Sequence, residues 1–321
     1  MKRFKQVETR LLLFLISGIL LLSIGFVSCG TGPQTKTTVP DRGAYAVDFS
    51  AAPSQLGFIS LGKSKNSMAG LTGFTVEACV KRNTSGTLNG GIFSRGTGDD
   101  DGSDWDGILL HIETNVPVFT MAIATTGSPY EVSGTTALTN GSWTHIAAVF
   151  ANTDHTSVHG TTATCTSANR SATPHIDIYV DGTLISCATT SSNNPAAFEY
   201  NEQIGRSQIH ALPSGSGSNL DTKLNAVIDE VRFWKVARTP SQIQQCRTQE
   251  LGVSGTCMIT LDLIGYWRLN QGTGTAITDY SGAPETGIAN TGTKNYCDSD
   301  CAGAGATTIL WEGGWTTGYL F

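Results

Sequence analysis

Apolar and polar residues alternate in six short runs along the chain, and this period of two is typical of β-strands. Successive side chains of a strand point to opposite sides, so an alternating run places its apolar residues on one face of a sheet. The pattern therefore predicts an all-β chain of antiparallel strands that pack on a shared core. The six runs are 44–49 (AYAVDF), 73–80 (GFTVEACV), 90–96 (GGIFSRG), 141–150 (GSWTHIAAVF), 175–186 (HIDIYVDGTLIS) and 225–238 (NAVIDEVRFWKVAR).

Two of these runs differ in the burial that their patterns predict. In 73–80 the apolar side chains share one face, while Thr75, Glu77 and Cys79 share the other, so a half-buried strand is expected. In 141–150 both faces are largely apolar, which favours a strand covered on both sides. Only the second of these strands is therefore expected to be enclosed completely.

Turn and cap residues mark the ends of two predicted elements. Asp181-Gly182 lies between two alternating segments, and this dipeptide favours a tight hairpin because both turn positions need positive φ. After the last run, Thr239 precedes Pro240, a sequence that places an N-cap residue before a proline at the first helical position. We therefore expect a hairpin at 175–186 and a short helix after residue 239.

Four motifs in chain order resemble the laminin G-like, concanavalin A-like jelly-roll family: GFTVEA (73–78), GSWTHIA (141–147), YVDG (179–182) and RTPSQI (238–243). The resemblance covers roughly residues 42–247. It implies an antiparallel two-sheet jelly-roll sandwich, a fold that binds glycans or proteins and only sometimes hydrolyses glycans. The chain has Cys79 where the family usually has tryptophan.

The resemblance also makes the strands at 73–80 and 225–238 neighbours in one sheet. Val231 and Phe233 are then predicted to point inward, and Arg232 outward on the side of Glu77. Glu77 and Arg232 are therefore expected to form a cross-strand ion pair. If exposed, such a pair contributes less than about 1 kcal/mol and is no evidence of function.

Residues 248–321 form a second region. The segment at 263–282 (LIGYWRLNQGTGTAITDYSG) resembles one that often neighbours these jelly rolls, but about 40 residues remain after it, too few for another domain. We expect a C-terminal extension of extra strands and a long loop packed on the sandwich. The aromatic-rich tail at 311–321 has two interpretations, a buried edge strand or an exposed binding surface.

The N-terminus predicts export. A basic start at 1–10 and an apolar stretch at 11–27 precede Cys29, which resembles a bacterial lipoprotein signal. The resemblance implies that 1–28 is a signal peptide, that Cys29 carries the lipid, and that 29–41 is a polar tether. The alternative is an uncleaved membrane anchor. The expected location is the cell envelope, at the outer membrane or cell surface.

Composition and net charge limit the classes of molecule that the protein is expected to bind. Charged residues make up 14% of the chain and there are 37 glycines, a mixture that suits sheets joined by many turns. The formal net charge is −6, and it becomes about −9 without residues 1–28. An acidic chain without a basic run disfavours nucleic acid as a partner.

Seven cysteines remain besides Cys29, so at least one has no disulfide partner in the same chain. Sequence spacing favours two local bridges, and a third would close the polar loop before the hairpin at 175–186. This assignment leaves Cys79 over. The predicted disulfides are Cys165–Cys187, Cys246–Cys257 and Cys297–Cys301.

A glucanase of this superfamily needs carboxylates aligned on one strand face, with the retaining pair about 5 Å apart. No strand of the chain supplies that pattern. Asp177 has no flanking glutamate, Glu199 and Glu202 fall on opposite faces, and Asp229 and Glu230 are adjacent. We therefore expect a protein that is not an enzyme.

The densest polar cluster is the segment GTGDDDGSDWDG at 96–107. Crowded carboxylates repel one another unless they are solvated or bound to a hard cation, and calcium prefers six to eight oxygen ligands. Two interpretations stay open, a calcium site or a solvated acidic loop. Trp105 either stacks on a bound sugar or packs within its own loop. The candidate calcium ligands are Asp99, Asp101, Asp104 and Asp106.

Together these features predict a lipid-anchored envelope protein that binds extracellular glycan or protein without catalysis. Two alternatives are a structural protein that assembles with itself or its neighbours, and a glycoside hydrolase.

Overall fold

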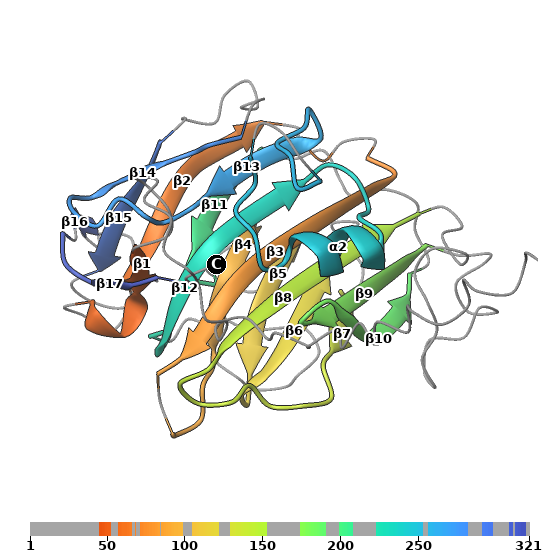
Figure 1. Cartoon of the computed structure of the whole chain (residues 1–321), viewed down its shortest axis with the longest axis horizontal. Helices are drawn as coiled ribbons and strands as arrows, with labels where there is room; N and C mark the ends of the chain where they lie inside the picture. Colours follow the sequence, from red (N-terminus) through yellow and green to blue (C-terminus); the bar gives the residue numbers. More distant parts are fainter. Residues whose placement is uncertain are drawn as a thin grey trace, which may run out of the picture.

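Two antiparallel β-sheets lie face to face in the computed structural model of the chain (Figure 1). The predicted all-β, two-sheet jelly-roll sandwich is confirmed. The N-terminal signal, Cys29 and the tether lie outside the described residues. The structure describes residues 45–52, 57–65, 68, 71–83, 85–98, 105–121, 129–152, 174–190, 199–207, 223–252, 256–281, 291–297, 308–310 and 312–318.

The first sheet has eight strands, and the long strands β8, β3 and β12 lie at its centre. β13 pairs with the C-terminal half of β12, from Val231 to Trp234. The order across the sheet is β10 (Thr183–Thr189), β9 (His175–Val180), β8 (Trp143–Ala151), β3 (Gly73–Arg82), β12 (Ala226–Trp234), β1 (Tyr45–Asp48) and β17 (Trp315–Thr317), with β13 spanning Leu263–Trp267.

The second sheet has nine strands, and β16 (Thr308–Leu310) joins it through β15. Its order is β14 (Ala276–Thr278), β15 (Thr291–Cys297), β2 (Gly57–Lys65), β11 (Glu199–Ile204), β4 (Gly90–Gly98), β5 (Trp105–Glu113), β6 (Val116–Met121) and β7 (Tyr130–Ser133). Strands after residue 247 thus pair with strands before it in both sheets.

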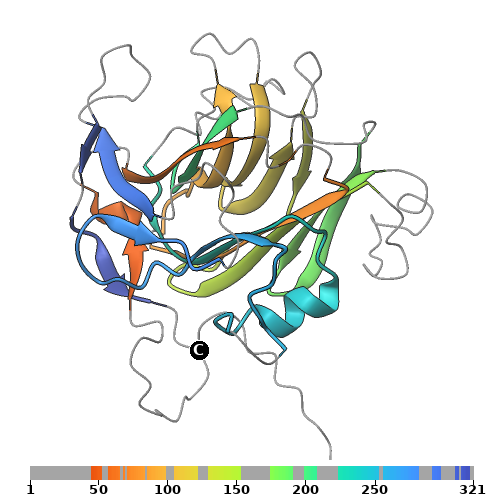
Figure 2. The same cartoon turned by 90° about the horizontal axis from the view of Figure 1, so that it is seen from above.

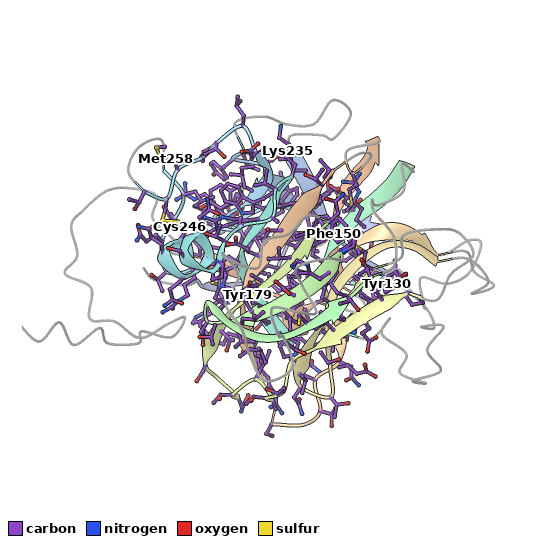
Figure 3. All side chains as sticks on the ribbon, turned by 90° about the vertical axis from the view of Figure 1, so that its right-hand side faces the viewer. Tyr130, Phe150, Tyr179, Lys235, Cys246 and Met258 are labelled. Carbon is purple, nitrogen blue, oxygen red and sulfur yellow. A yellow bond between two sulfur atoms is a disulfide. The ribbon has the colours of Figure 1, made fainter. Side chains whose placement is uncertain are left out.

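Aromatic side chains from both sheets interlock between them. Phe74 of β3 lies 5.4 Å from Phe150 of β8 and 6.1 Å from Phe119 of β6, measured between ring centroids. Phe93 of β4 reaches across to Phe233 of β12 at 5.6 Å. Figure 3 shows Phe150 in this interior. Burying large rings supplies much of the apolar area that stabilises such a sandwich.

The outer face of the first sheet is covered, which the sequence pattern did not predict. Thr75, Glu77 and Cys79 of β3 are all buried, so the expectation of a half-buried strand is wrong. α2 (Pro240–Cys246) lies on this face (Figure 2), where its Ile243 packs against residues of β8 and β9. The strand at 141–150 is enclosed on both faces, as predicted.

The predicted hairpin at 175–186 and the predicted helix after residue 239 are both confirmed. Asp181 and Gly182 have φ of 48° and 76° and join β9 to β10. Thr239 caps α2: its side chain accepts from Gln242 N, and the Gln242 side chain accepts in turn from Thr239 N, which completes a capping box. The other described helix is a single 3₁₀ turn, η1 (Phe49–Ala51). Neither has the length and apolar character needed to cross a bilayer.

The described part of the C-terminal tail pairs with β1 through β17 and also contacts Lys294 of β15. Trp315 of β17 is half-buried, and its Nε1 donates to Gly274 O at 3.1 Å. Lys294 Nζ lies 4.1 Å from the centroid of the Trp315 ring and donates to Gly313 O at 2.7 Å. Partial burial of Trp315 agrees with the edge-strand interpretation at this position.

Candidate functional site

The predicted calcium and ligand residues follow β4 in the sequence and extend into the start of β5. Asp99, Asp101 and Asp104 lie outside the described residues. Trp105 and Asp106 begin β5, where they pair in register with the last two residues of β4. Within the described ranges no group of three or more His, Cys, Asp or Glu residues could hold a metal ion. Calcium and the role of Trp105 therefore stay predictions.

A row of mostly polar residues crosses the outer face of the second sheet, and it is called the polar row below. Its members are direct cross-strand partners, so they share one face of the sheet. Their strand neighbours, such as Ile204, Phe93 and Phe119, belong to the core between the sheets. The row runs Thr293, Ser60, Gln203, Ser94, Leu109, Thr120 and Glu131, from β15 through β2, β11, β4, β5 and β6 to β7.

The middle of the polar row is buried but short of hydrogen bonds. Ser94, Thr120 and Gln203 are between 0% and 9% exposed, and Ser94 Oγ, Thr120 Oγ1 and Gln203 Oε1 have no hydrogen-bond partner. Leaving a buried polar atom unpaired costs about 1–3 kcal/mol, so such atoms are rare in native proteins. Their concentration in one row indicates a place where a bound molecule could supply the missing partners.

His111 adds a neutral imidazole beside the row. It lies two residues after Leu109 on the same face of β5, and it is fully buried. Burial lowers the pKa of His111 to about 3, although a hydrogen bond with the Leu109 backbone acts in the opposite direction. Both ring nitrogens lack side-chain partners. The ring is therefore uncharged near neutral pH and offers one donor and one acceptor.

The β7 end of the row is acidic. Burial raises the pKa of Glu131, and the charge of Glu113 raises it further. The Thr120 hydroxyl offsets part of this rise, although it does not reach ordinary hydrogen-bond geometry with the carboxylate. The polar row itself contains no cationic side chain, so its described members favour an uncharged ligand over an anionic one.

A second polar cluster lies under α2, on the outer face of the first sheet. Glu77 accepts from Arg238 Nη1 at 2.6 Å, and it lies 3.5 Å from Arg232 Nη1 and 3.3 Å from His145 Nε2. Burial acts to raise the pKa of Glu77, but Arg238, His145 and Arg232 outweigh it and hold the pKa well below its usual range. The predicted Glu77–Arg232 pair is therefore present, and it is buried rather than exposed.

Arg232 extends this cluster toward β13. Its Nη2 donates to Glu230 Oε2 at 2.9 Å, and its Nη1 donates to Cys246 O at 2.9 Å. Tyr266 OH donates to the same Glu230 oxygen at 2.7 Å. The carboxylates of Glu77 and Glu230 thus neutralise the buried arginines, which is a structural role.

Sequence reasoning missed the buried ion pairs Arg238–Glu77 and Arg232–Glu230, and also one that lies between the two sheets. Arg95 of β4 and Glu202 of β11 are cross-strand partners that face the core, with Nη1 and Oε1 2.9 Å apart. The Arg95 guanidinium also lies 5.8 Å from the Phe233 ring of the opposite sheet. The period-two pattern contained a signal for this pair, because Arg95 and Glu202 lie two residues from the core residues Phe93 and Ile204 and therefore on the same strand faces.

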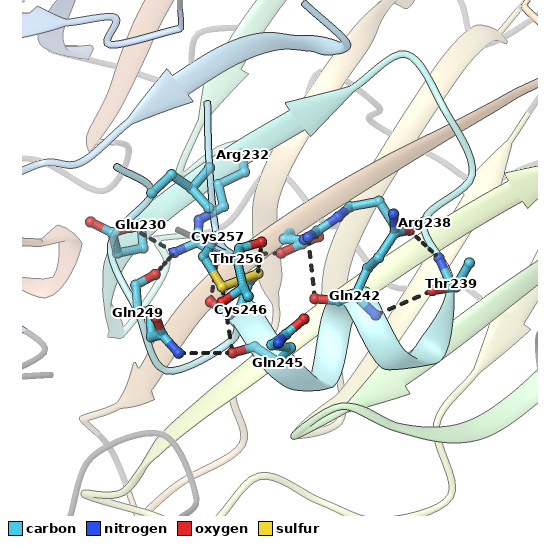
Figure 4. The surroundings of a disulfide bond; sticks show 12 residues. Glu230, Arg232, Arg238, Thr239, Gln242, Gln245, Cys246, Gln249, Thr256 and Cys257 are labelled. Carbon is cyan, nitrogen blue, oxygen red and sulfur yellow. Dashed lines mark hydrogen bonds and ion pairs between the residues drawn. A yellow bond between two sulfur atoms is a disulfide. The ribbon is translucent and has the colours of Figure 1, made fainter. Parts of the chain in front are cut away.

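One predicted disulfide is confirmed. Cys246 at the end of α2 is bonded to Cys257, with the Cα atoms 5.4 Å apart (Figure 4). Cys187 is disulfide-bonded, as predicted, but its expected partner Cys165 lies outside the described residues. Cys79 is a thiol, as the spacing predicted, and it is fully buried.

The third predicted disulfide, Cys297–Cys301, is not tested. Cys297 ends β15, but its side chain and the whole of Cys301 lie outside the described part of the chain.

Comparisons with solved structures find similar proteins at low sequence identity. A candidate carbohydrate-binding protein from Bacteroides ovatus is 19% identical, with 84% of this chain and 61% of that chain covered and a TM-score of 0.46. This chain therefore spans about three fifths of the length of that protein. A pentraxin from Limulus polyphemus, described as SAP-like, is 11% identical over 86% and 94% of the two chains, with a TM-score of 0.40. Domains LG4–5 of the mouse laminin α1 chain are 15% identical, with 64% and 44% covered and a TM-score of 0.38.

A search of curated proteins finds no match. A laminin G-type family model does match, over residues 57–244, and this range runs from the first strand of the second sheet into α2. The match covers more than half of the chain, and the two-sheet architecture agrees with it. The chain belongs to the laminin G-like family of the concanavalin A-like lectin/glucanases superfamily.

Proposed function

We propose that this protein binds uncharged extracellular glycans, without catalysis, through the polar row on the outer face of the second sheet. The observation that carries the proposal is the set of buried polar atoms without hydrogen-bond partners on Ser94, Thr120 and Gln203, with the buried neutral ring of His111 beside them. Membership of a superfamily that contains lectins supports a binding role.

The chemistry of the row suits sugar hydroxyls. Hydroxyl, carboxamide and neutral imidazole groups combine donors with acceptors, as sugar hydroxyls do. The acidic end at Glu131 repels anionic sugars, and no cation in the row would attract them. Direct hydrogen bonds from strand side chains also fix the register of the ligand across β11, β4, β5 and β6.

A glycan array on the purified full-length protein tests this proposal. Thr120→Val removes one hydroxyl from the row at nearly constant volume, and Thr183→Val makes the same change on the exposed edge strand β10. A hydrogen bond contributes about 0.5–1.5 kcal/mol, so Thr120→Val should weaken binding by roughly twofold to tenfold. Thr183→Val should leave it unchanged. Absence of any glycan ligand, or equal affinity in both variants, rejects the proposal, and self-association at micromolar concentration would favour the structural alternative.

We also propose that Asp99, Asp101, Asp104 and Asp106 bind calcium. Carboxylate oxygens are suitable ligands for a hard cation. A ligand that binds only the folded state raises its melting temperature, so calcium should raise that of the wild type and not that of Asp101→Asn. No shift in either protein would indicate a solvated acidic loop.

We further propose that a lipid on Cys29 attaches the protein to the membrane. The lipoprotein-like sequence at 1–29 supports it. Labelled palmitate should appear on the wild-type protein, and Cys29→Ala should abolish both labelling and membrane attachment. An unlabelled protein that stays in the membrane fraction would favour an uncleaved anchor.

A further inference from the structure

A pocket of about 160 Å³ opens on the outer side of the first sheet, away from the polar row. It lies where β12 ends, between α2 and the loop that the Cys246–Cys257 disulfide closes. Figure 4 shows its two sides, with Gln242 and Gln245 on α2 and Thr256 on the loop. The two sides are therefore covalently linked before any ligand binds.

Trp234 forms one wall of this pocket and carries an unused donor. The residue is 4% exposed, and its indole Nε1 is buried without a hydrogen-bond partner. Trp234 packs with Cys246 and Cys257 rather than in the core between the sheets, and it lines the pocket. A buried N–H of this kind needs an acceptor, and the pocket is where a ligand oxygen could supply it.

Arg238 covers the face of the Trp234 ring. Its guanidinium lies 4.3 Å from the ring centroid, and it is held there by Glu77 at 2.6 Å and by the Gln242 carbonyl at 3.1 Å. A sugar needs a free aromatic face for stacking. Because this face is already occupied, the pocket suits a ligand that presents an acceptor to the edge of the ring.

Carboxamides line the neighbouring wall. Gln242 Oε1 accepts from the Thr239 backbone, which leaves its amide N–H groups for other acceptors. Gln245 is exposed on the same side of α2. A carboxamide has an N–H donor and a carbonyl acceptor arranged as in a peptide group. A peptide backbone can therefore donate to its oxygen and accept from its nitrogen.

The rim of the pocket is apolar. Val236 and Met258 line it, and Leu261 lies between two further lining residues in the sequence. These are three of the five exposed large hydrophobic residues among the described residues, with exposed fractions between 36% and 75%. Figure 3 shows Met258 at the surface near Cys246. Such a concentration is typical of a surface that contacts another protein.

We propose that this pocket binds an extended peptide segment of a protein partner. A backbone carbonyl of the peptide accepts from Trp234 Nε1, a neighbouring peptide group pairs with Gln245, and an apolar side chain lies between Val236 and Met258. The disulfide, the helix cap and the fixed Arg238 hold the walls in place, which lowers the entropy lost on binding. The proposal is independent of glycan binding by the polar row.

Selection from a displayed library of random dodecapeptides on the full-length protein tests this site. Enriched peptides are then synthesised, and their affinity is measured by fluorescence anisotropy. Gln245→Ala and Met258→Lys change exposed side chains, so both variants should fold normally. Each should weaken binding by about tenfold or more if it removes a central contact. Trp234→Phe keeps a ring beneath Arg238 and removes the N–H, and a comparable loss is expected.

Leu310→Lys is the matched control for Met258→Lys, because it places the same charge on an exposed apolar residue of β16. It should leave peptide affinity unchanged. Failure to enrich any peptide over a scrambled library overturns the proposal, and so does full affinity in both Met258→Lys and Gln245→Ala. Glycan binding should persist in all these variants, so the two proposals fail separately.

Discussion

Glu77→Gln should strongly destabilise the fold, because the Glu77 carboxylate neutralises two buried arginines. Its carboxylate lies 2.6 Å from Arg238 Nη1 and 3.5 Å from Arg232 Nη1, and all three side chains are buried. Glutamine keeps the shape but removes the charge. Arg232 retains Glu230 at 2.9 Å, whereas Arg238 retains only a carbonyl and the Trp234 ring.

Removing one partner of a buried ion pair costs about 3–5 kcal/mol, since the other charge stays desolvated. Urea unfolding at pH 7, followed by tryptophan fluorescence, should show a loss of this size for Glu77→Gln. Arg238→Met supplies the second arm of a double-mutant cycle. Each single variant already breaks the Glu77–Arg238 pair, so the sum of the two single losses counts the energy of that pair twice. The double variant should therefore lose clearly less stability than this sum.

The pH dependence has a definite sign. The pKa of Glu77 lies below its ordinary value of 4.5 in the folded state. Its contribution to stability is therefore fully present above pH 4.5 and is lost as the pH falls below that value. Wild-type stability should decline on acidification more steeply than that of Glu77→Gln. A loss below about 1 kcal/mol at pH 7, or strict additivity in the cycle, would refute the reasoning.

Three further predictions concern the contributions of His111, Lys294 and the Cys246–Cys257 disulfide to stability. The His111 pKa falls from 6.5 to about 3 on folding, so the unfolded chain binds the extra proton and stability should drop by up to about 5 kcal/mol between pH 6.5 and pH 3. Acid titration of His111→Gln should show a shallower loss over this range. Lys294 is buried, and this burial lowers its pKa from 10.5 to about 8, so stability should rise between pH 8 and pH 10.5, and Lys294→Met should remove that rise. The Cys246–Cys257 bridge joins residues 11 apart, and loop-closure entropy gives it about 3 kcal/mol. Replacing both cysteines by serine should lower the urea-unfolding free energy by that amount, and an unchanged value would assign the stability of the loop to its packing.

Short-range features were predictable because each depends on a few consecutive residues. The period of two identified β1, β3, β4, β8, β9, β10 and β12, but not strands such as β2, β5, β6, β7 and β11. Asp181-Gly182 marked a hairpin whose positive φ values the structure has, and Thr239-Pro240 marked the start of α2. The bridge between Cys246 and Cys257 followed from their spacing. In each case local sterics, hydrogen bonding or chain length limits the possibilities before any tertiary contact forms.

Alternation alone could not tell which strand faces are covered. The face of Glu77 looked like a solvated one, because its residues are polar, but α2 and the disulfide loop bury it. Likewise, Glu202 was considered only as a possible catalytic carboxylate, and it is an interior partner of Arg95. A polar residue on a strand is compatible with water, with a partner charge or with a ligand, and only its neighbours in space decide among them.

The sequence by itself determined the class of fold, seven of the described strands, one hairpin, one helix start and one disulfide of this protein. The tertiary structure decided what those strands bring together. Ser60, Ser94, Thr120 and Gln203 are far apart in the chain, and the polar row exists because strand register aligns them on one face. Register depends on pairing between distant segments, which no local pattern encodes, so a candidate site built across strands becomes visible only when the sheet is assembled.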